Sequence, residues 1–248
     1  MSIKVSVITV VYNAGDVFET TLKSVRDQKY LHIEYIVVDG GSKDNTLELI
    51  EKYKEGISKW ISESDEGLYS AMNKGLKMAT GDYVIFLNAG DLFFDSEVLE
   101  RIFDTSLALS DVYYGETMII DKEGREIGMR RLKAPEVLTW KSLIDGMLVC
   151  HQSFIVKKSI APEYNIKYKI AADYDWMLNC LKKAGTITNT HQIISKFLDG
   201  GLNKQNIRKA LKERFLIMIQ SYNIFLVVLN HIPITYRFAV SYLKNRRF

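Results

Sequence analysis

One stretch does most to decide the fold of this chain: Ile85-Phe86-Leu87-Asn88-Ala89-Gly90-Asp91. Its apolar first half is typical of a buried strand, and this strand runs directly into a polar turn that ends in a carboxylate. In an open α/β sheet, ligands bind in the crevice outside the carboxyl ends of the strands. Asp91 is therefore well placed to bind a divalent cation or a ribose.

Two similar strand ends precede this one in the sequence. Residues 5–11 form a β-branched run that ends in a polar turn, and residues 35–38 form a second run that ends at Asp39. Each run is followed by a helical pattern, at residues 17–28 and 45–54. This alternation is the βαβ pattern of a parallel sheet, so all three strand ends can share one crevice.

The alternation of strand and helix continues to about residue 100 and then changes. Residues 57–63 and 82–87 are strand candidates, and residues 69–80 and 96–109 have helical spacing. After these come strands at 112–114 and 117–120, a hairpin turn at 121–124, a helix that ends near residue 181, and a helical C-terminal extension. We predict an α/β fold with a Rossmann-like, mostly parallel central sheet that is flanked by helices.

The composition is that of an ordinary globular protein. The 248 residues are 47% hydrophobic and 25% charged, which excludes disordered and collagen-like classes. Two cysteines without metal-ligand spacing and four scattered histidines argue against a disulfide framework and a zinc site. The first residues lack the pattern of a signal peptide, so we expect a cytoplasmic location.

The charge is distributed unevenly along the chain. Residues 201–248 carry nine Lys and Arg but a single acid, Glu213, whereas the first 200 residues carry 24 basic and 29 acidic side chains. Polar residues and a proline interrupt the apolar run of 215–234, so it does not read as a membrane span. We expect a basic amphipathic segment that lies on an anionic membrane surface. Packing back on the rest of the chain, or a dimer contact, is the alternative.

Two carboxylates at strand ends are candidates for ligand binding. Asp39 can accept a hydrogen bond from a ribose hydroxyl or a base N–H. Asp91 is the metal candidate, because Mg²⁺ and Mn²⁺ commonly bind through one or two carboxylates together with substrate phosphates. A turn with a helix cap is the alternative interpretation of the Asp39 motif, and a simple turn is the alternative for the motif that ends at Asp91.

Two helix starts carry further candidates. Asn73 and Lys74 lie near the start of a helix, where a lysine can bind a phosphate; a solvated lysine is the alternative. Asp173 and Asp175 precede an apolar helix, and residues two apart do not share a helix face. One of these carboxylates can therefore face a cleft as a general base while the other caps the helix.

Six motifs occur in an order and spacing that are far more specific than any one of them. Together they resemble the inverting family 2 glycosyltransferases, which have the GT-A fold. The resemblance covers roughly residues 3–200 and is nearest to bacterial enzymes that build surface polysaccharides such as colanic acid and O-antigens. The motifs are Val-Ile-Thr-Val-Val-Tyr-Asn (7–13), Val-Val-Asp-Gly-Gly-Ser-Lys-Asp-Asn-Thr (37–46), Asn-Lys-Gly (73–75), Ala-Thr-Gly-Asp-Tyr (79–83), Phe-Leu-Asn-Ala-Gly-Asp (86–91) and Asp-Tyr-Asp (173–175).

The resemblance implies a role for individual residues. Asp173 is expected to be the general base with Asp175 in support, Asp91 to bind a divalent Mn²⁺ or Mg²⁺, and His151 to lie near the acceptor or the diphosphate; a satisfied, half-buried histidine is the alternative for His151. The residues expected to bind the nucleotide sugar and its metal are Thr9, Val11, Tyr12, Asn13, Asp39, Gly41, Asn73, Lys74, Asn88, Ala89, Asp91 and His151.

The resemblance also implies an activity and its setting. We expect sugar transfer with inversion from a UDP-, GDP- or dTDP-linked donor to a glycan acceptor that can be lipid-linked, in polysaccharide or lipopolysaccharide biosynthesis. The expected catalytic domain is 1–204, with a nucleotide-binding half at 1–100 and an acceptor half at 101–204. The tail at 205–248 is expected to bind the inner face of the cytoplasmic membrane. A homodimer is compatible with this organisation, and nucleic acid is not an expected partner.

The chain departs from the family pattern at three places, and other functions stay open. Gly40 stands where a second Asp is common, Asn88 and its neighbours replace further acids of the metal element, and Met72 replaces an arginine. A nucleotidyltransferase is one alternative, although its glycine-rich basic loop is missing after residues 5–11. An oxidoreductase would need Gly-x-Gly-x-x-Gly there. A non-catalytic binding or scaffold protein with the same fold is the third.

Overall fold

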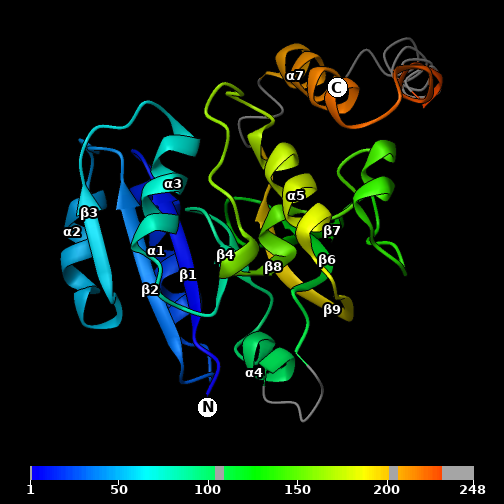
Figure 1. Cartoon of the computed structure of the whole chain (residues 1–248). Helices are drawn as coiled ribbons and strands as arrows, with labels where there is room; N and C mark the ends of the chain where they lie inside the picture. Colours follow the sequence, from blue (N-terminus) through cyan, green and yellow to red (C-terminus); the bar gives the residue numbers. More distant parts are fainter. Residues whose placement is uncertain (1, 104–108, 201–205, 231–248) are drawn as a thin grey trace.

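The computed structural model describes residues 2–103, 109–200 and 206–230, and its described strands form a single mixed sheet (Figure 1). The strand order is β3-β2-β1-β4-β8-β6-β9-β5, and β7 pairs with β6 beside this path. The first half consists of β1 (Val5–Val11), β2 (Ile33–Asp39), β3 (Lys59–Ser62) and β4 (Tyr83–Phe86), which are all parallel.

The second half of the sheet is mixed rather than parallel. Strand β8 (Phe154–Lys157) is antiparallel to both β4 and β6 (Val112–Ile120). Strand β9 (Ile187–Leu198) runs parallel to β6, and it pairs antiparallel with β5 (Leu92–Phe93). The expectation of a mostly parallel sheet therefore holds for the first half only. The α/β fold class is confirmed.

Helices cover both faces of the sheet because its strands are apolar on both sides. On one face of the sheet, Ile8 and Val10 of β1 are buried in a cluster with residues of α3 (Leu68–Met78) and α5 (Ala172–Lys183). The other cluster joins Val5 and Val7 to the side that carries α1 (Gly15–Arg26), with α2 (Thr46–Lys52) and α4 (Val98–Phe103) packed on it. The short 3₁₀ helices are Lys54–Gly56, Trp140–Asp145, His151–Ser153 and Lys158–Ile160.

Most of the expected elements are present, with shifted ends. Residues 112–120 form one strand instead of two, because they stay paired with β9 through shifts of register. The expected hairpin turn at 121–124 is confirmed and leads into β7 (Glu126–Met129). The expected helix at 96–109 is seen as α4, and residues 104–108 lie outside the described residues.

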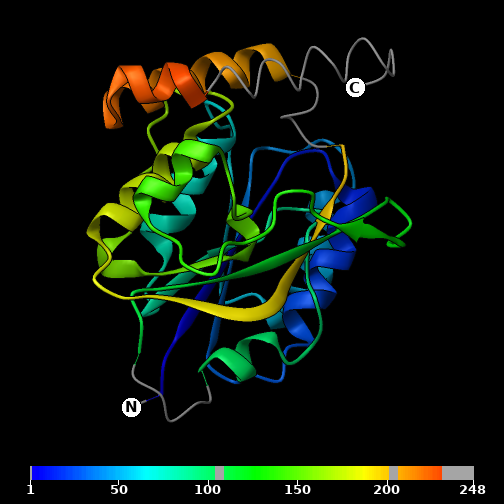
Figure 2. The same ribbon diagram turned by 90° about the vertical axis from the view of Figure 1, so that its right-hand side faces the viewer.

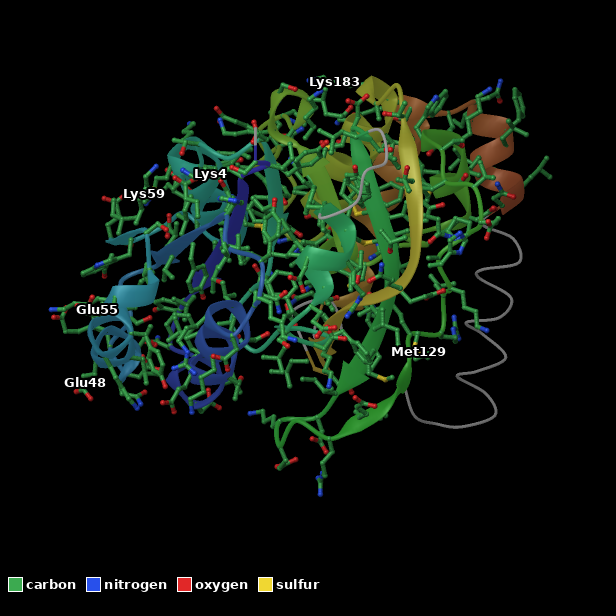
Figure 3. The ribbon with its side chains drawn as sticks, turned by 90° about the horizontal axis from the view of Figure 1, so that it is seen from below. Lys4, Glu48, Glu55, Lys59, Met129 and Lys183 are labelled. Atoms are coloured by element: carbon green, nitrogen blue, oxygen red, sulfur yellow. The ribbon has the colours of Figure 1, made fainter. Side chains whose placement is uncertain are left out.

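A buried carboxylate holds the amino ends of the first strands together. Glu34 of β2 accepts hydrogen bonds from Ser6 and Thr80 and forms ion pairs with Lys4 (3.3 Å) and Lys59 (2.9 Å). Figure 3 shows both lysines on the same side of the molecule. Burial alone would raise the pKa of Glu34, but these partners outweigh it and lower the pKa. The opposite edge of the sheet, where the strands end, is left free for ligands.

The described part of the C-terminal extension packs on the rest of the chain. Helix α7 (Ile207–Ser221) lies across the end of α5, as Figure 2 shows in orange above yellow. Ile217 and Met218 are buried in the same cluster as α5, and the Tyr222 ring stacks on Trp140 with centroids 5.6 Å apart. For residues 207–222 the structure shows the alternative of packing back, whereas a division at residue 204 stays a prediction. No helix among the described residues has both the length and the hydropathy that crossing a bilayer requires.

Candidate functional site

A cavity of about 1060 Å³ opens at the carboxyl ends of β1, β2 and β4. Its wall includes Tyr12 after β1, Gly40 after β2 and Asn88 after β4, so the three strand ends meet as the sequence predicts. The opposite wall is built by the second half of the chain, from the loop at 147–152, the start of α5 and one residue of α7. A volume of this size accommodates a nucleotide-sized ligand together with a second substrate.

Asp91 lines the cavity, and two hydrogen bonds hold its carboxylate in place. Gln152 Nε2 donates to its Oδ2 at 2.7 Å, and the backbone N–H of Leu198 donates to its Oδ1 at 3.0 Å. The carboxylate is only 4% exposed, and burial raises its pKa to about 7. Gly90 supplies the turn with a φ of +95°, and a Cβ there would lie 2.6 Å from the Leu198 side chain.

A buried thiol sets the orientation of the glutamine. Cys150 Sγ donates to Gln152 Oε1 at 2.7 Å, which directs the Gln152 amide N–H₂ toward Asp91. Burial raises the pKa of Cys150 to about 11, so the thiol keeps its proton at neutral pH. The chain Cys150–Gln152–Asp91 therefore delivers hydrogen-bond donors to the carboxylate but no positive charge.

The residues beside Asp91 fit a hard divalent cation. The described residues contain no group of three or more His, Cys, Asp or Glu that could enclose a metal by themselves. The buried Oδ1 of Asn88, however, has no hydrogen-bond partner among them, and Asn88 lines the cavity next to Asp91. One carboxylate and one free amide oxygen match a Mg²⁺ or Mn²⁺ site whose other ligands are substrate phosphates and water.

Asp173 and His151 form a second polar group in the same cavity. Asp173 is 5% exposed; its Oδ1 accepts the backbone N–H of Tyr174 at 2.8 Å, and its Oδ2 lies 4.0 Å from His151 Nδ1. Burial lowers the pKa of His151, so this imidazole is neutral, and its Nε2 has no partner among the described residues. Oδ2 of Asp173 is thus available to accept a proton from a ligand.

The tail helix positions the backbone that carries Asp173. Glu213 of α7 accepts the backbone N–H groups of Lys169 (3.0 Å), Ile170 (2.8 Å) and Ala171 (3.0 Å), directly before α5 begins. Burial alone would raise the pKa of Glu213, but these three donors lower it. The single acid of the basic tail therefore caps the helix on which the proposed base lies.

The structure brings about half of the predicted site residues into the cavity wall. Those that line it are Val11, Tyr12, Asn88, Ala89, Asp91, His151 and Asp173. Those that do not line it are Thr9, Asn13, Asp39, Gly41, Asn73 and Lys74. Asp175 does not line it either, so the two carboxylates at the start of α5 face different surroundings.

Predicted residues outside the wall have structural partners instead. Oxygens of Asp39 accept hydrogen bonds from the backbone N–H groups of Gly41 and Ser42 and from the hydroxyls of Ser42 and Ser62. Its carboxylate is fully buried and holds the turn that presents Gly40 to the cavity, rather than facing the cavity itself. Thr9 is also buried and donates to the Leu87 carbonyl at 2.7 Å.

Asn73 and Lys74 are likewise engaged elsewhere. The Asn73 side chain pairs with the backbone of Tyr164, donating to its carbonyl (2.9 Å) and accepting its N–H (2.7 Å). Lys74 Nζ lies 2.6 Å from Glu63 and 2.7 Å from Asp65. In this structure Asn73 joins α3 to the distant segment at Tyr164, and the Lys74 charge is neutralised by acids rather than facing a phosphate.

Sequence reasoning missed several residues of the wall. Asp65, Tyr69, Arg130 and Arg214 line the cavity, and none of them was predicted as a site residue. Asp65 lies in the polar run before α3, which gave a weak signal. Arg214 lies in the basic tail, where the surrounding charges directed attention to a membrane surface. The isolated acid next to it, Glu213, was the one signal that this part of the tail packs inward.

Comparison with known proteins identifies the family. The sequence model described as "Glycosyl transferase family 2" matches residues 6–164. The chain is 28% identical over 220 residues to a PGL/p-HBAD biosynthesis glycosyltransferase of Mycobacterium bovis, which covers 84% of this chain and 82% of that protein. It is 29% identical over 221 residues to the putative teichuronic acid biosynthesis glycosyltransferase TuaG of Bacillus subtilis, with 86% of each chain covered.

Solved structures with low sequence identity share the fold. Residues 1–349 of Staphylococcus aureus TarS, in complex with UDP-GlcNAc, superpose with a TM-score of 0.65 at 22% identity, covering 86% of this chain and 65% of that one. A mannosyltransferase of Pyrobaculum calidifontis, in complex with GDP-Man and Mn²⁺, gives 0.64 at 15% identity, covering 90% and 66%. The GT-A architecture is thereby confirmed.

The raised pKa of Asp91 leads to a testable pH dependence. Folding favours the protonated form of a carboxyl whose pKa rises from about 3.9 to about 7. Its contribution to stability is therefore complete below about pH 4 and is lost as the pH rises to about 7. Between pH 5 and pH 8, metal-free wild type should lose on the order of 2 kcal/mol of unfolding free energy relative to Asp91→Asn.

Urea unfolding of both proteins at several pH values measures this difference. Mn²⁺ or Mg²⁺ added at pH 8 should stabilise the wild type and leave Asp91→Asn unchanged, because the metal needs the ionised carboxylate. Parallel pH profiles of the two proteins would show that Asp91 is not desolvated, contrary to its position in the structure.

Proposed function

The chain belongs to glycosyl transferase family 2, and we propose that it transfers a sugar, with inversion, from a nucleoside diphosphate sugar to a glycan acceptor in the synthesis of a bacterial surface polysaccharide or lipopolysaccharide. One observation supports this proposal most. Asp91, beside the loops after β1 and β2, and Asp173, on the opposite wall, line the same cavity. A donor and an acceptor can therefore meet between them.

Inversion requires a single displacement at the anomeric carbon. The acceptor hydroxyl attacks from the side opposite the nucleoside diphosphate, which leaves with the electron pair of the broken bond. Oδ2 of Asp173 accepts the hydroxyl proton, and such general-base assistance contributes roughly 10²–10⁴-fold to a rate. Burial lowers the pKa of His151, which disfavours a positively charged imidazolium beside this carboxylate.

Asp91 and Asn88 are the residues that would hold a divalent cation in this cavity. When bound, such an ion neutralises negative charge on the leaving diphosphate. The protein contributes a desolvated carboxylate whose hydrogen-bond donors are uncharged. The positive charge of the ion would therefore be balanced by this carboxylate and by the phosphates of the donor. The P. calidifontis relative in fold is seen with Mn²⁺, which agrees with this choice of metal.

We further propose that the end of the described chain touches a membrane surface. The helix at 224–230 exposes a patch of large apolar side chains, which are from 47% to 76% exposed: Ile224, Phe225, Leu226, Val228 and Leu229. Contiguous apolar surface of this kind is typical of interaction sites. Basic residues precede and follow it in the sequence, which favours an anionic lipid surface over a second copy of the same basic chain.

A donor screen tests the proposed transferase activity. Purified protein is mixed with Mn²⁺ or Mg²⁺ and a panel of UDP-, GDP- and dTDP-sugars, and thermal unfolding and donor hydrolysis are followed. We expect one class of nucleotide sugar to stabilise the wild type, with a smaller effect on Asp91→Ala because that variant lacks the metal-binding carboxylate. If no nucleotide stabilised the protein, with or without metal, a non-catalytic binding or scaffold role would replace the transferase.

The base is tested by the substitution Asp173→Asn. The amide cannot accept the hydroxyl proton, so the turnover number should fall at least about a hundredfold while donor binding is kept. Asp175→Asn is the matched control, since that carboxylate lies two residues away on the same helix and outside the cavity wall. Near-normal turnover by Asp173→Asn would move the role of base to another residue.

Vesicle flotation tests the membrane proposal. Phe225→Ser together with Leu229→Ser removes two of the most exposed apolar side chains, and binding to vesicles with anionic phosphatidylglycerol should fall at least about tenfold. Neutral phosphatidylcholine vesicles should bind less of the wild type. Unchanged flotation would refute the proposal, and a wild-type dimer that the double variant dissociates would identify a second copy as the occupant.

A further inference from the structure

Two arginines of the cavity wall form no ion pair with a carboxylate of the described residues. Arg130 donates through Nη2 to the Met147 carbonyl (2.6 Å) and through Nη1 to the Leu148 carbonyl (3.1 Å), which are both neutral acceptors. The buried Nε of Arg214 has no hydrogen-bond partner among the described residues. Neither guanidinium forms an ion pair with a carboxylate in that part of the chain.

The two positive charges, which both line the cavity, act on each other. Burial lowers the pKa of Arg130, and the charge of Arg214 works in the same direction. Holding two like charges out of water is unfavourable unless an anion compensates them. The exposed side chains of Lys122, Arg131 and Lys169 add further positive charge to the wall. An arginine presents a planar fork of N–H donors that matches the oxygens of a phosphate.

The position of the pair places this anion near the acceptor. Arg214 follows Glu213, whose carboxylate caps the backbone just before α5, so Arg214 is anchored at the end of the helix that carries Asp173. The charge of Asp173 also acts on Arg130. Asp91 and Asn88, beside which we place the phosphates of the donor, line the same cavity from the turn after β4.

The chain beyond Arg214 adds a third part to this arrangement. Helix α7 leads into the helix at 224–230 with its exposed apolar side chains. In order, the chain thus offers an apolar surface, a pair of guanidinium groups and a general base. A sugar carried on a lipid diphosphate has three parts in the same order: a hydrocarbon chain, two phosphates and the reacting hydroxyl.

Building on the proposed function, we propose that Arg130 and Arg214 bind a phosphate group of the acceptor, and that this acceptor is a sugar linked to a lipid diphosphate. The arginines hold the carrier's phosphate while the sugar hydroxyl lies at Asp173. The specificity of the acceptor side therefore depends in part on a helix outside the region that the family's sequence model matches.

Calorimetric titration with farnesyl diphosphate tests this site, with farnesol as the ligand that lacks the phosphates. Arg214→Gln should lower the affinity for farnesyl diphosphate at least about tenfold, since the substitution removes charge-assisted hydrogen bonds. Arg214→Lys, which keeps the charge but loses the fork, should give an intermediate affinity. Arg208→Gln on the exposed side of α7 is the matched control and should stay within about twofold of wild type.

Titration of the same variants with UDP, GDP and dTDP separates the acceptor from the donor. Nucleotide affinity should be equal in wild type and Arg214→Gln. A comparable loss of nucleotide affinity would assign the arginines to the donor diphosphate and overturn the inference. The inference would also be overturned if Arg214→Gln and wild type bound farnesyl diphosphate with equal affinity. The same holds if the wild type bound farnesol as tightly as farnesyl diphosphate. Failure of the wild type to bind any nucleotide would instead count against the proposed function.

Discussion

The parallel alignment of β1, β2 and β4 is the constraint on which the site depends. These strands are buried on both faces, and their register is continuous from Val5↔Ile33 to Val11↔Asp39. Their carboxyl ends must therefore lie at one edge, and each must turn there into a polar loop. Because the amino ends are held at the other edge by the buried carboxylate of Glu34, neither the loops nor the ligand site can shift without breaking the sheet.

The second half of the chain closes the site by surrounding Asp91. Leu198 at the end of β9 and Gln152 after the 147–151 loop both donate to its carboxylate, so one acid joins the two halves of the sheet. Without a cation this arrangement is electrostatically incomplete, since it removes water from the carboxylate and supplies no positive charge in return. The same burial that raises its pKa would favour binding of the divalent cation that we propose for this site.

Elements with strong periodicity were predictable, and elements defined by distant partners were not. The β-branched run of β1 was predicted with its bounds, whereas β8 is only four residues long and β9 mixes polar and apolar residues because it is a half-buried strand. Tyr12, Asn88 and Asp91, which the strand-end rule selected, line the cavity. Asp39, which the same rule selected, does not line it. A sequence shows that a carboxylate can accept hydrogen bonds, but it does not show that the neighbouring backbone and serines supply them.

The hydrogen bonds that Glu213 accepts determine which residues belong to one folding unit. Sequence similarity to the family model stops at residue 164, yet three backbone N–H groups next to Asp173 find their acceptor at residue 213. Opening of α7 would leave these amides without a partner, so loosening of the tail and loosening of the helix start belong to one cooperative transition. The unit that folds together thus extends beyond the region that the family model matches, and a helix outside that region holds the backbone segment next to Asp173.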